Sequence, residues 1–123
     1  MQCKRVAVLG LAFKPNSDDV RDSPALDIAA RLHELGASVA AYDPEAVVTA
    51  RRIRPELEYV ERATDAHRDA ELVLVLTEWN EFRELDAATA AALVSVPVVV
   101  DGRNCLDREA WVAAGFTYRG MGR

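Results

Sequence analysis

The fold class follows most directly from residues 5–35, which read RVAVLGLAFKPNSDDVRDSPALDIAARLHEL. The apolar run at residues 5–9 is typical of a buried strand, and residues 24–35 carry apolar side chains at helical spacing. Gly36 suits the position just after the end of such a helix. The predicted helix presents one apolar face, made of Ala25, Ile28, Ala29, Leu32 and Leu35. This stretch therefore predicts a strand, a long loop and a helix in succession.

The same alternation of strand and helix continues to the end of the chain. Further strands are expected at residues 38–42, 58–60, 72–77, 96–100 and 117–119, and further helices at residues 44–53, 87–94 and 108–114. Right-handed strand–helix–strand units build a mainly parallel sheet with helices on both faces. We therefore expect an α/β fold of three layers, an open, doubly wound, Rossmann-like sheet whose first five strands take the common order 3-2-1-4-5.

Composition limits the number of domains and the kinds of partner. The 123 residues, half of them hydrophobic, fit one domain with a packed core, and the net charge of −5 argues against non-specific nucleic-acid binding. The longest uncharged stretch, residues 87–100, is too short for a transmembrane helix, and no signal peptide is visible. Cys3 and Cys105 are too few for a disulfide scaffold or a zinc site. These features predict a cytoplasmic protein that binds neither membrane nor metal.

The loop after the first strand, residues 10–24, is longer than most strand-to-helix connections, and such loops are usually functional. It is not a dinucleotide-binding fingerprint, because Ala12 and Pro15 stand where GxGxxG would need glycines after Gly10. It is not a P-loop either, because GxxxxGK[ST] is absent. We therefore do not expect this domain to hold NAD in the usual Rossmann way.

Three side chains in this loop suit an anionic nucleotide. An aromatic ring stacks on a base, an ammonium group contacts a phosphate, and a guanidinium group grips a phosphate with two hydrogen bonds. Phe13, Lys14 and Arg21 provide these groups. Phe13 could instead pack in the core, and Arg21 could instead pair with a neighbouring aspartate of the loop.

Two other strand ends carry candidate residues. The segment DGRN, residues 101–104, directly follows the strand VPVVV. In it Gly102 allows a sharp turn, and Arg103 can face a ligand or only solvent. Trp79 and Phe82 follow the strand LVLVLT, and we expect them to pack beneath the loop rather than contact ligand. Because strands one, four and five are neighbours in the expected order, their loops meet at one edge. The sequence thus predicts a positively lined pocket for a nucleotide diphosphate, and no nucleophile–base pair stands out.

Four motifs carry a resemblance to a known family. In order along the chain they are GLAFKPNSDDVRDSPAL, YDP, TEWNEF and DGRN, and the similarity runs from about residue 5 to residue 120. They resemble the C-terminal UDP-binding domain of the UDP-glucose and GDP-mannose 6-dehydrogenases, with greatest similarity to the UDP-glucose branch. The resemblance implies an enzyme that oxidises the C6 alcohol of a nucleotide sugar to a carboxylate with two NAD⁺ through a cysteine thioester.

The same resemblance implies roles for individual residues. Phe13 and Lys14 match the family's substrate-binding Phe–Lys pair, and Arg103 matches its substrate-binding arginine. Arg21 matches an arginine that reaches the NAD cofactor across a cleft between domains. Neither cysteine of this chain lies in the family's catalytic motif, so no catalytic residue is expected here.

We therefore expect residues 1–123 to form a single UDP-sugar-binding domain. The resemblance implies that the NAD domain and the central helical segment of a parent enzyme lie outside this chain, that the parent is a homo-oligomer, and that this chain alone is inactive. Two alternatives stay open: a domain of a related UDP-N-acetylmannosamine or GDP-mannose dehydrogenase, and a free-standing nucleotide-binding or interaction module. The sequence leaves open whether Glu78 and Trp79 contact ligand.

Overall fold

The computed structural model describes residues 4–12 and 24–120. The strands are β1 (Arg5–Leu9), β2 (Ser38–Tyr42), β3 (Glu58–Tyr59), β4 (Leu72–Val75), β5 (Val98–Asp101) and β6 (Thr117–Gly120). The helices are α1 (Pro24–Glu34), α2 (Val47–Ile53), α3 (Ala63–His67), α4 (Asn80–Arg83), α5 (Ala87–Leu93) and α6 (Arg108–Ala113).

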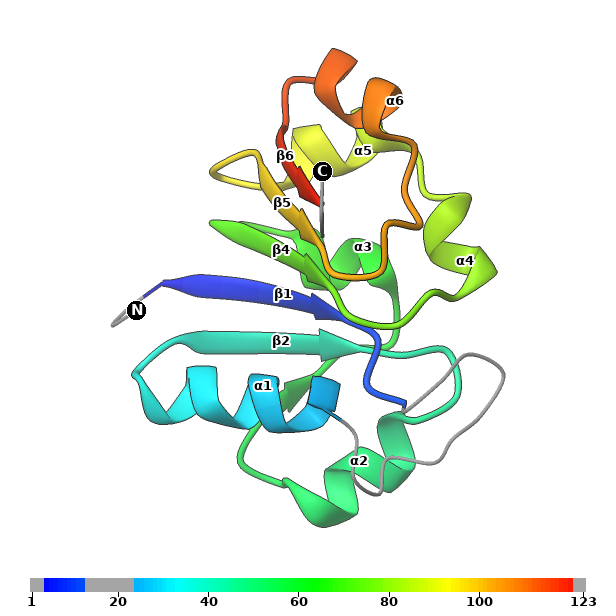
Figure 1. The fold of residues 1–123 in the computed structure, drawn as a ribbon. Helices are drawn as coiled ribbons and strands as arrows, with labels where there is room; N and C mark the ends of the chain where they lie inside the picture. The colour runs from blue at the N-terminus through cyan, green and yellow to red at the C-terminus, as the bar shows by residue number, and fades with distance from the viewer. Residues whose placement is uncertain (1–3, 13–23, 121–123) are drawn as a thin grey trace.

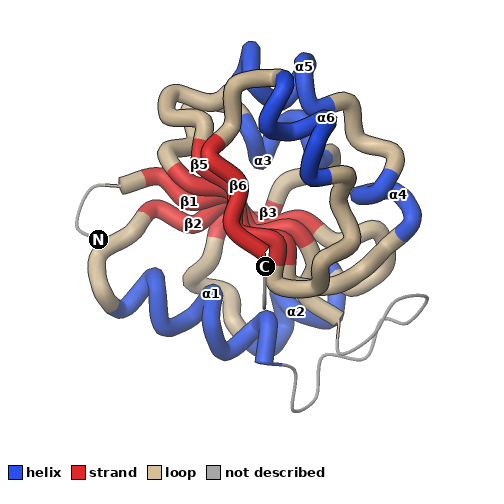
Figure 2. The backbone as a smooth tube through the Cα atoms, turned by 45° about the horizontal axis from the view of Figure 1, so that its top comes forward, coloured by secondary structure: helices blue, strands red, loops and turns tan. Residues whose placement is uncertain are grey.

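The strands form one six-stranded sheet in the order β3-β2-β1-β4-β5-β6, and every neighbouring pair is parallel. Helices α1 and α2 cover one face of the sheet, and α3, α5 and α6 cover the other (Figures 1 and 2). The expected doubly wound, three-layer α/β fold is confirmed, including the order 3-2-1-4-5 for the first five strands. The strand order reverses between β1 and β4, and both strands lie at the centre of the core.

Several predicted boundaries were wrong for local reasons. Strand β5 begins at Val98 and not at residue 96, because Pro97 has no N–H group to offer a neighbouring strand. Helix α2 begins at Val47 and not at residue 44, because the side chain of Asp43 holds the next three residues in a turn. The short helices α3 and α4 were not predicted, since segments of this length carry little periodicity.

Helix α1 ends as predicted but is rotated relative to the expected apolar face. Gly36 has a φ of +95°, and the Gly36 and Ala37 N–H groups bond back to the last turn in a Schellman motif. The buried side chains are Ala25, Leu26, Ala29 and Ala30, whereas Ile28 and Leu35 are 40% and 47% exposed. Small alanine side chains let the helix lie close to the sheet, so the larger Ile28 is left at the margin.

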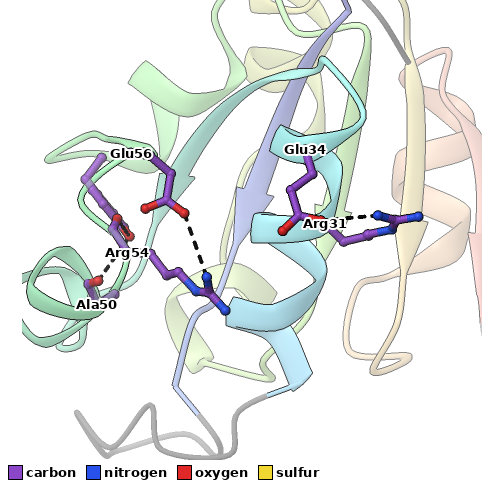
Figure 3. A network of polar contacts seen from close by, with 6 residues as sticks. Arg31, Glu34, Ala50, Arg54 and Glu56 are labelled. Atoms are coloured by element: carbon purple, nitrogen blue, oxygen red, sulfur yellow. Dashed lines mark hydrogen bonds and ion pairs between the residues drawn. The ribbon is translucent and has the colours of Figure 1, made fainter.

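Stability comes from the apolar interior and not from surface ion pairs. On the face away from α1, Trp111 and Phe116 pack with ring centroids 4.7 Å apart, and Phe82 is completely buried. By contrast, the Arg31–Glu34 and Arg54–Glu56 pairs span 3.2 and 3.9 Å at exposed positions (Figure 3). Exposed pairs of this kind contribute little to folding free energy.

The loops that follow β1 and β4 come into close contact at Gly10, which directly follows β1. Its φ is +101°, and a Cβ atom there would lie 2.6 Å from the backbone nitrogen and the Cβ of Thr77. The Gly10 N–H donates to the Tyr42 carbonyl oxygen at 2.7 Å. Gly10 is therefore required both for its backbone conformation and for the contact between the loops that follow β1 and β4.

Replacing Gly10 with alanine should lower the free energy of unfolding by about 3 kcal/mol or more, because backbone strain adds to a collision with the backbone nitrogen and the side chain of Thr77. Gly115→Ala is the matched control, since Gly115 has a similar φ of +107° but no atom within 4 Å of the place that a Cβ would take. That control should cost only about 1–2 kcal/mol. Urea unfolding measures both losses, and equal losses would contradict the close contact at Gly10.

His67, at the end of α3, is a buried titratable side chain. It is 1% exposed, its ring centroid lies 6.5 Å from that of Trp111, and neither ring nitrogen has a hydrogen-bond partner among the described residues. Burial lowers the pKa of His67, and the nearby Ala63 backbone partly opposes that shift. The imidazole is therefore neutral in the folded protein at neutral pH.

Because the folded pKa of His67 lies below its unfolded value of about 6.5, the unfolded chain binds the additional proton. The free energy of unfolding should therefore fall as the pH drops below about 6.5, by up to about 1.4 kcal/mol per pH unit. His67→Leu should flatten this dependence, while the exposed His33 remains in both proteins. Urea unfolding between neutral and mildly acidic pH is the measurement, and an unchanged slope in the variant would exclude His67 as its source.

Candidate functional site

The candidate site lies at the carboxyl edge of the sheet, where the loops after β1, β2, β4 and β5 meet (Figure 1). Thr77, completely buried, donates a hydrogen bond from Oγ1 to the Ala12 carbonyl oxygen at 2.9 Å. The Leu76 N–H donates to the Leu9 carbonyl oxygen at 2.9 Å and prolongs the pairing of β1 with β4. The edge at which the strand order reverses is thus closed by direct contacts, and ligands of such sheets bind outside it.

Asp43, the first residue after β2, accepts hydrogen bonds from several loops. Its Oδ2 accepts from the Leu11 and Ala12 N–H groups at 2.8 and 3.0 Å and from the Trp79 indole Nε1 at 3.1 Å. Its Oδ1 accepts from the N–H groups of Glu45 and Ala46, both at 2.8 Å. The residue is 2% exposed. One buried carboxylate therefore joins the loops that follow three neighbouring strands.

This arrangement bears on cofactor binding. In dinucleotide-binding Rossmann domains, an acidic residue after the second strand accepts hydrogen bonds from the ribose hydroxyls of NAD. Asp43 occupies that place in the chain order, but protein donors already use both of its oxygens. A carboxylate offers about four acceptor positions. Asp43 therefore has no acceptor position left for a ribose, which supports the expectation that this domain does not hold NAD in the usual way.

Arg103 is exposed at the same edge, just beyond β5. Its Nε donates to the Leu76 carbonyl oxygen at 3.0 Å, which docks the guanidinium group against the end of β4. The turn before it is tight, because the Gly102 N–H donates to the Val75 carbonyl oxygen at 2.8 Å and a Cβ on Gly102 would lie 3.0 Å from that oxygen. The geometry holds a permanent positive charge beside the reversal point of the sheet.

A second buried carboxylate supports the turn that carries Arg103. Asp101 is completely buried and accepts from the Arg103 N–H at 3.2 Å, the Leu106 N–H at 2.8 Å and the Tyr118 hydroxyl at 2.8 Å. The Cys105 thiol lies 3.8 Å from the same carboxylate. Desolvation by burial, together with the charge of Asp101, raises the pKa of Cys105 to about 11. The thiol stays protonated at neutral pH, which supports the expectation that Cys105 is not a nucleophile.

A pocket of about 440 Å³ opens beside Arg103. Its walls come from the first turns of α1 and from the ends of β4 and β5, with mostly apolar side chains: Pro24, Ala25, Ile28, Leu74, Leu76, Val100, Gly102 and Arg103. An apolar floor suits the ring of a base or the carbon face of a ribose, and the guanidinium group suits an anionic phosphate. The exposure of Ile28, unexpected from its place on the predicted helix face, is explained because it lines this pocket.

The other predicted site residues have different outcomes. Phe13, Lys14 and Arg21 lie outside the described residues, so their proposed roles stay predictions. Trp79 is 6% exposed and Phe82 is completely buried against the edge of the Tyr42 ring, which confirms that both pack in the interior.

Sequence reasoning missed the structural roles of Asp43, Thr77 and Asp101. The available signal in the sequence was a short polar residue at the end of an apolar strand. For Asp43 the next residue is a proline, and for Asp101 it is a glycine. Across residues 4–12 and 24–120, no group of three or more His, Cys, Asp or Glu side chains is arranged to hold a metal ion. Over that same part of the chain, every helix is too short or too polar to cross a membrane.

Comparisons with known proteins show which family the chain resembles. The chain is 45% identical over 121 residues to the UDP-glucose 6-dehydrogenase TuaD of Bacillus subtilis, a match that covers 98% of this chain and 26% of that protein. It superposes with a TM-score of 0.81 and 36% identity on a UDP-glucose dehydrogenase from Pyrobaculum islandicum, covering 98% of this chain and 26% of that one. For an NDP-N-acetyl-D-galactosaminuronic acid dehydrogenase from Methanosarcina mazei the TM-score is 0.86, with 31% identity and coverages of 99% and 25%.

These matches define what part of a larger protein the chain corresponds to. The chain spans about a quarter of the length of the relatives that it matches. Residues 7–108 match the family model described as "UDP-glucose/GDP-mannose dehydrogenase family, UDP binding domain". The chain therefore belongs to the UDP-glucose/GDP-mannose dehydrogenase family and represents its UDP-binding domain.

Proposed function

We propose that this chain binds the UDP group of a UDP-sugar at the carboxyl edge of its sheet. The observation that carries the proposal is Arg103, held by Leu76 and Asp101 at the mouth of an apolar pocket, in a chain that matches a UDP-binding domain. The guanidinium group pairs with the diphosphate, and the pocket receives the nucleoside. Phe13 and Lys14 complete the substrate site, and Arg21 faces the cofactor of the parent enzyme; these three roles rest on the sequence resemblance.

The proposed parent is an NAD-dependent UDP-glucose 6-dehydrogenase that oxidises UDP-glucose to UDP-glucuronate with two NAD⁺. Curated relatives with that name are 36–45% identical to this chain. The identity to the solved galactosaminuronic acid dehydrogenase is lower, at 31%. We therefore favour UDP-glucose over N-acetylated hexoses as the sugar nucleotide.

The division of labour within that parent is also proposed. This chain supplies binding and orientation of the nucleotide, while the remaining three-quarters of the parent supplies the NAD site and the nucleophilic cysteine. NAD contributes hydride acceptance when bound, and the chain's own part is to hold the UDP group so that the sugar faces the other domain. The homo-oligomeric assembly and cytoplasmic location of the parent stay predictions from the sequence.

UDP should bind the 123-residue chain with a dissociation constant on the order of millimolar, or about −4 kcal/mol. Binding is weak because Arg103 is exposed to solvent, where charge-assisted contacts act in a high dielectric and are screened by salt. Arg103→Ala should weaken binding by about 1–2 kcal/mol. Amide NMR during a UDP titration gives the affinity and locates the site.

The matched control for that titration is Arg52→Ala, which removes the same charge from an exposed position on α2. It should leave the UDP affinity nearly unchanged. Shift changes should include residues 10–12 and 101–104. The site is misplaced if the shifts centre on Glu58 and Tyr59, or if Arg103→Ala binds UDP as well as the unaltered chain does.

The chain alone, given UDP-glucose and NAD⁺, should produce no NADH above background. The physical reason is that Cys105 is protonated at neutral pH and Asp43 has no acceptor position for a ribose. NADH absorbance is the measurement, with a full-length relative as the positive control. Turnover that survives the double change Cys3→Ser and Cys105→Ser would instead identify a catalytic site within this chain.

A further inference from the structure

We propose that Asp43, assisted by Thr77, is a positioning residue for nucleotide binding. Its buried carboxylate holds the peptide groups of Leu11 and Ala12, which lead directly into the predicted ligand-binding pair that begins at Phe13. This inference rests on the proposed function, because it concerns the same UDP site. Asp43 itself does not contact the nucleotide, since both of its oxygens are used by the protein.

The three N–H groups of residues 10–12 all have defined partners. The Gly10 N–H is bound by the Tyr42 carbonyl oxygen, and the N–H groups of Leu11 and Ala12 are bound by Asp43. The Ala12 carbonyl oxygen accepts from Thr77. The described segment is therefore held from both sides as far as Ala12, the residue before Phe13 in the sequence. Binding groups need such support, because misplacement by about 0.5 Å already weakens a contact.

The hydrogen bonds of Asp43 require a carboxylate, and a neutral polar side chain of the same size could not make all of them. All the partners of Asp43 are N–H donors: the four backbone groups and the Trp79 indole. An asparagine has a single acceptor oxygen and would direct its own amide N–H groups at some of these donors. Asp43→Asn therefore keeps the volume but releases either the segment after β1 or the turn after β2.

The fluorescence of the Trp79 indole can report a movement of the segment that Asp43 holds. Trp79 shares Oδ2 of Asp43 with the Leu11 and Ala12 N–H groups, so a shift of that segment changes the surroundings of the indole. The other tryptophan, Trp111, lies on α6 and packs against Phe116. In a Trp111→Phe background, Trp79 alone reports the segment.

The experiment compares UDP affinity in the 123-residue chain with Asp43→Asn, Thr77→Val and a control, Phe116→Leu. The control loosens the core around Trp111, so it lowers the stability without removing any hydrogen-bond partner of Asp43 or Thr77. Amide NMR of the folded protein should show UDP binding weakened on the order of tenfold by Asp43→Asn and about threefold by Thr77→Val. Phe116→Leu should leave the dissociation constant unchanged.

Two further measurements separate positioning from general destabilisation. Amide hydrogen exchange in Asp43→Asn should speed up at Leu11 and Ala12 more than at Val73, and the change should also appear in Trp79 emission. In the full-length parent, Asp43→Asn should raise KM for the UDP-sugar more than it lowers kcat, because the residue acts on binding.

The outcomes distinguish this inference from the proposed function. If the unaltered chain does not bind UDP, the proposed function fails and the inference fails with it. If the unaltered chain binds UDP and Asp43→Asn binds it equally well, only the inference is overturned. If Asp43→Asn does not fold, Thr77→Val provides the test, and an unchanged dissociation constant in that variant overturns the inference. An equal loss of affinity in Phe116→Leu overturns it as well.

Discussion

Two buried carboxylates organise the carboxyl edge of this sheet, and the loops of the candidate site depend on them. Asp43 and Asp101 each stand at the end of a strand and accept backbone N–H groups from the loop that follows. Burying a charge in a protein interior is costly unless hydrogen bonds compensate it, and both residues receive several. The same bonds that stabilise each charge also set the direction of the backbone. Stability and site geometry therefore share one cause at this edge.

The two carboxylates support different parts of the candidate site. Asp101 and Gly102 set the turn that presents Arg103, while Asp43 sets the start of the segment after β1. The pocket of about 440 Å³ lies beside Arg103, against the first turns of α1. The chain spans about a quarter of the length of the relatives that it matches, and we propose that the rest of the parent supplies the other wall of the binding cleft. This explains why a domain with well-supported binding groups is expected to hold UDP weakly when it stands alone.

Most of the architecture could be predicted because the strands are continuous apolar runs. Residues 6–9 and 73–75 are buried on both sheet faces, and such runs are typical of parallel strands covered by helices. The predicted helix start and the predicted helix face were wrong where a side-chain hydrogen bond, or a position beside the pocket, outweighed the local pattern of apolar residues. Helix α2 starts late because Asp43 holds the residues before it, and Ile28 is exposed because it faces the pocket. Arg103 could be proposed from the sequence, because a charged residue directly after a strand end is visible there.

The order of apolar runs, turn residues and helical periodicity established the α/β class, the strand order and the edge at which a ligand is expected. These properties are local, or follow from the handedness of strand–helix–strand units, so they can be predicted from the sequence. The roles of Asp43, Thr77 and Asp101 became visible only in three dimensions. Asp43 accepts hydrogen bonds from residues 31 and 32 positions away in the sequence, and Thr77 donates one to a residue 65 positions away. Bonds over such separations depend on the order of the strands in the sheet. In the sequence, an aspartate that binds a ribose looks the same as one that accepts backbone N–H groups of the protein. The folded structure determines which of the two roles the residue has.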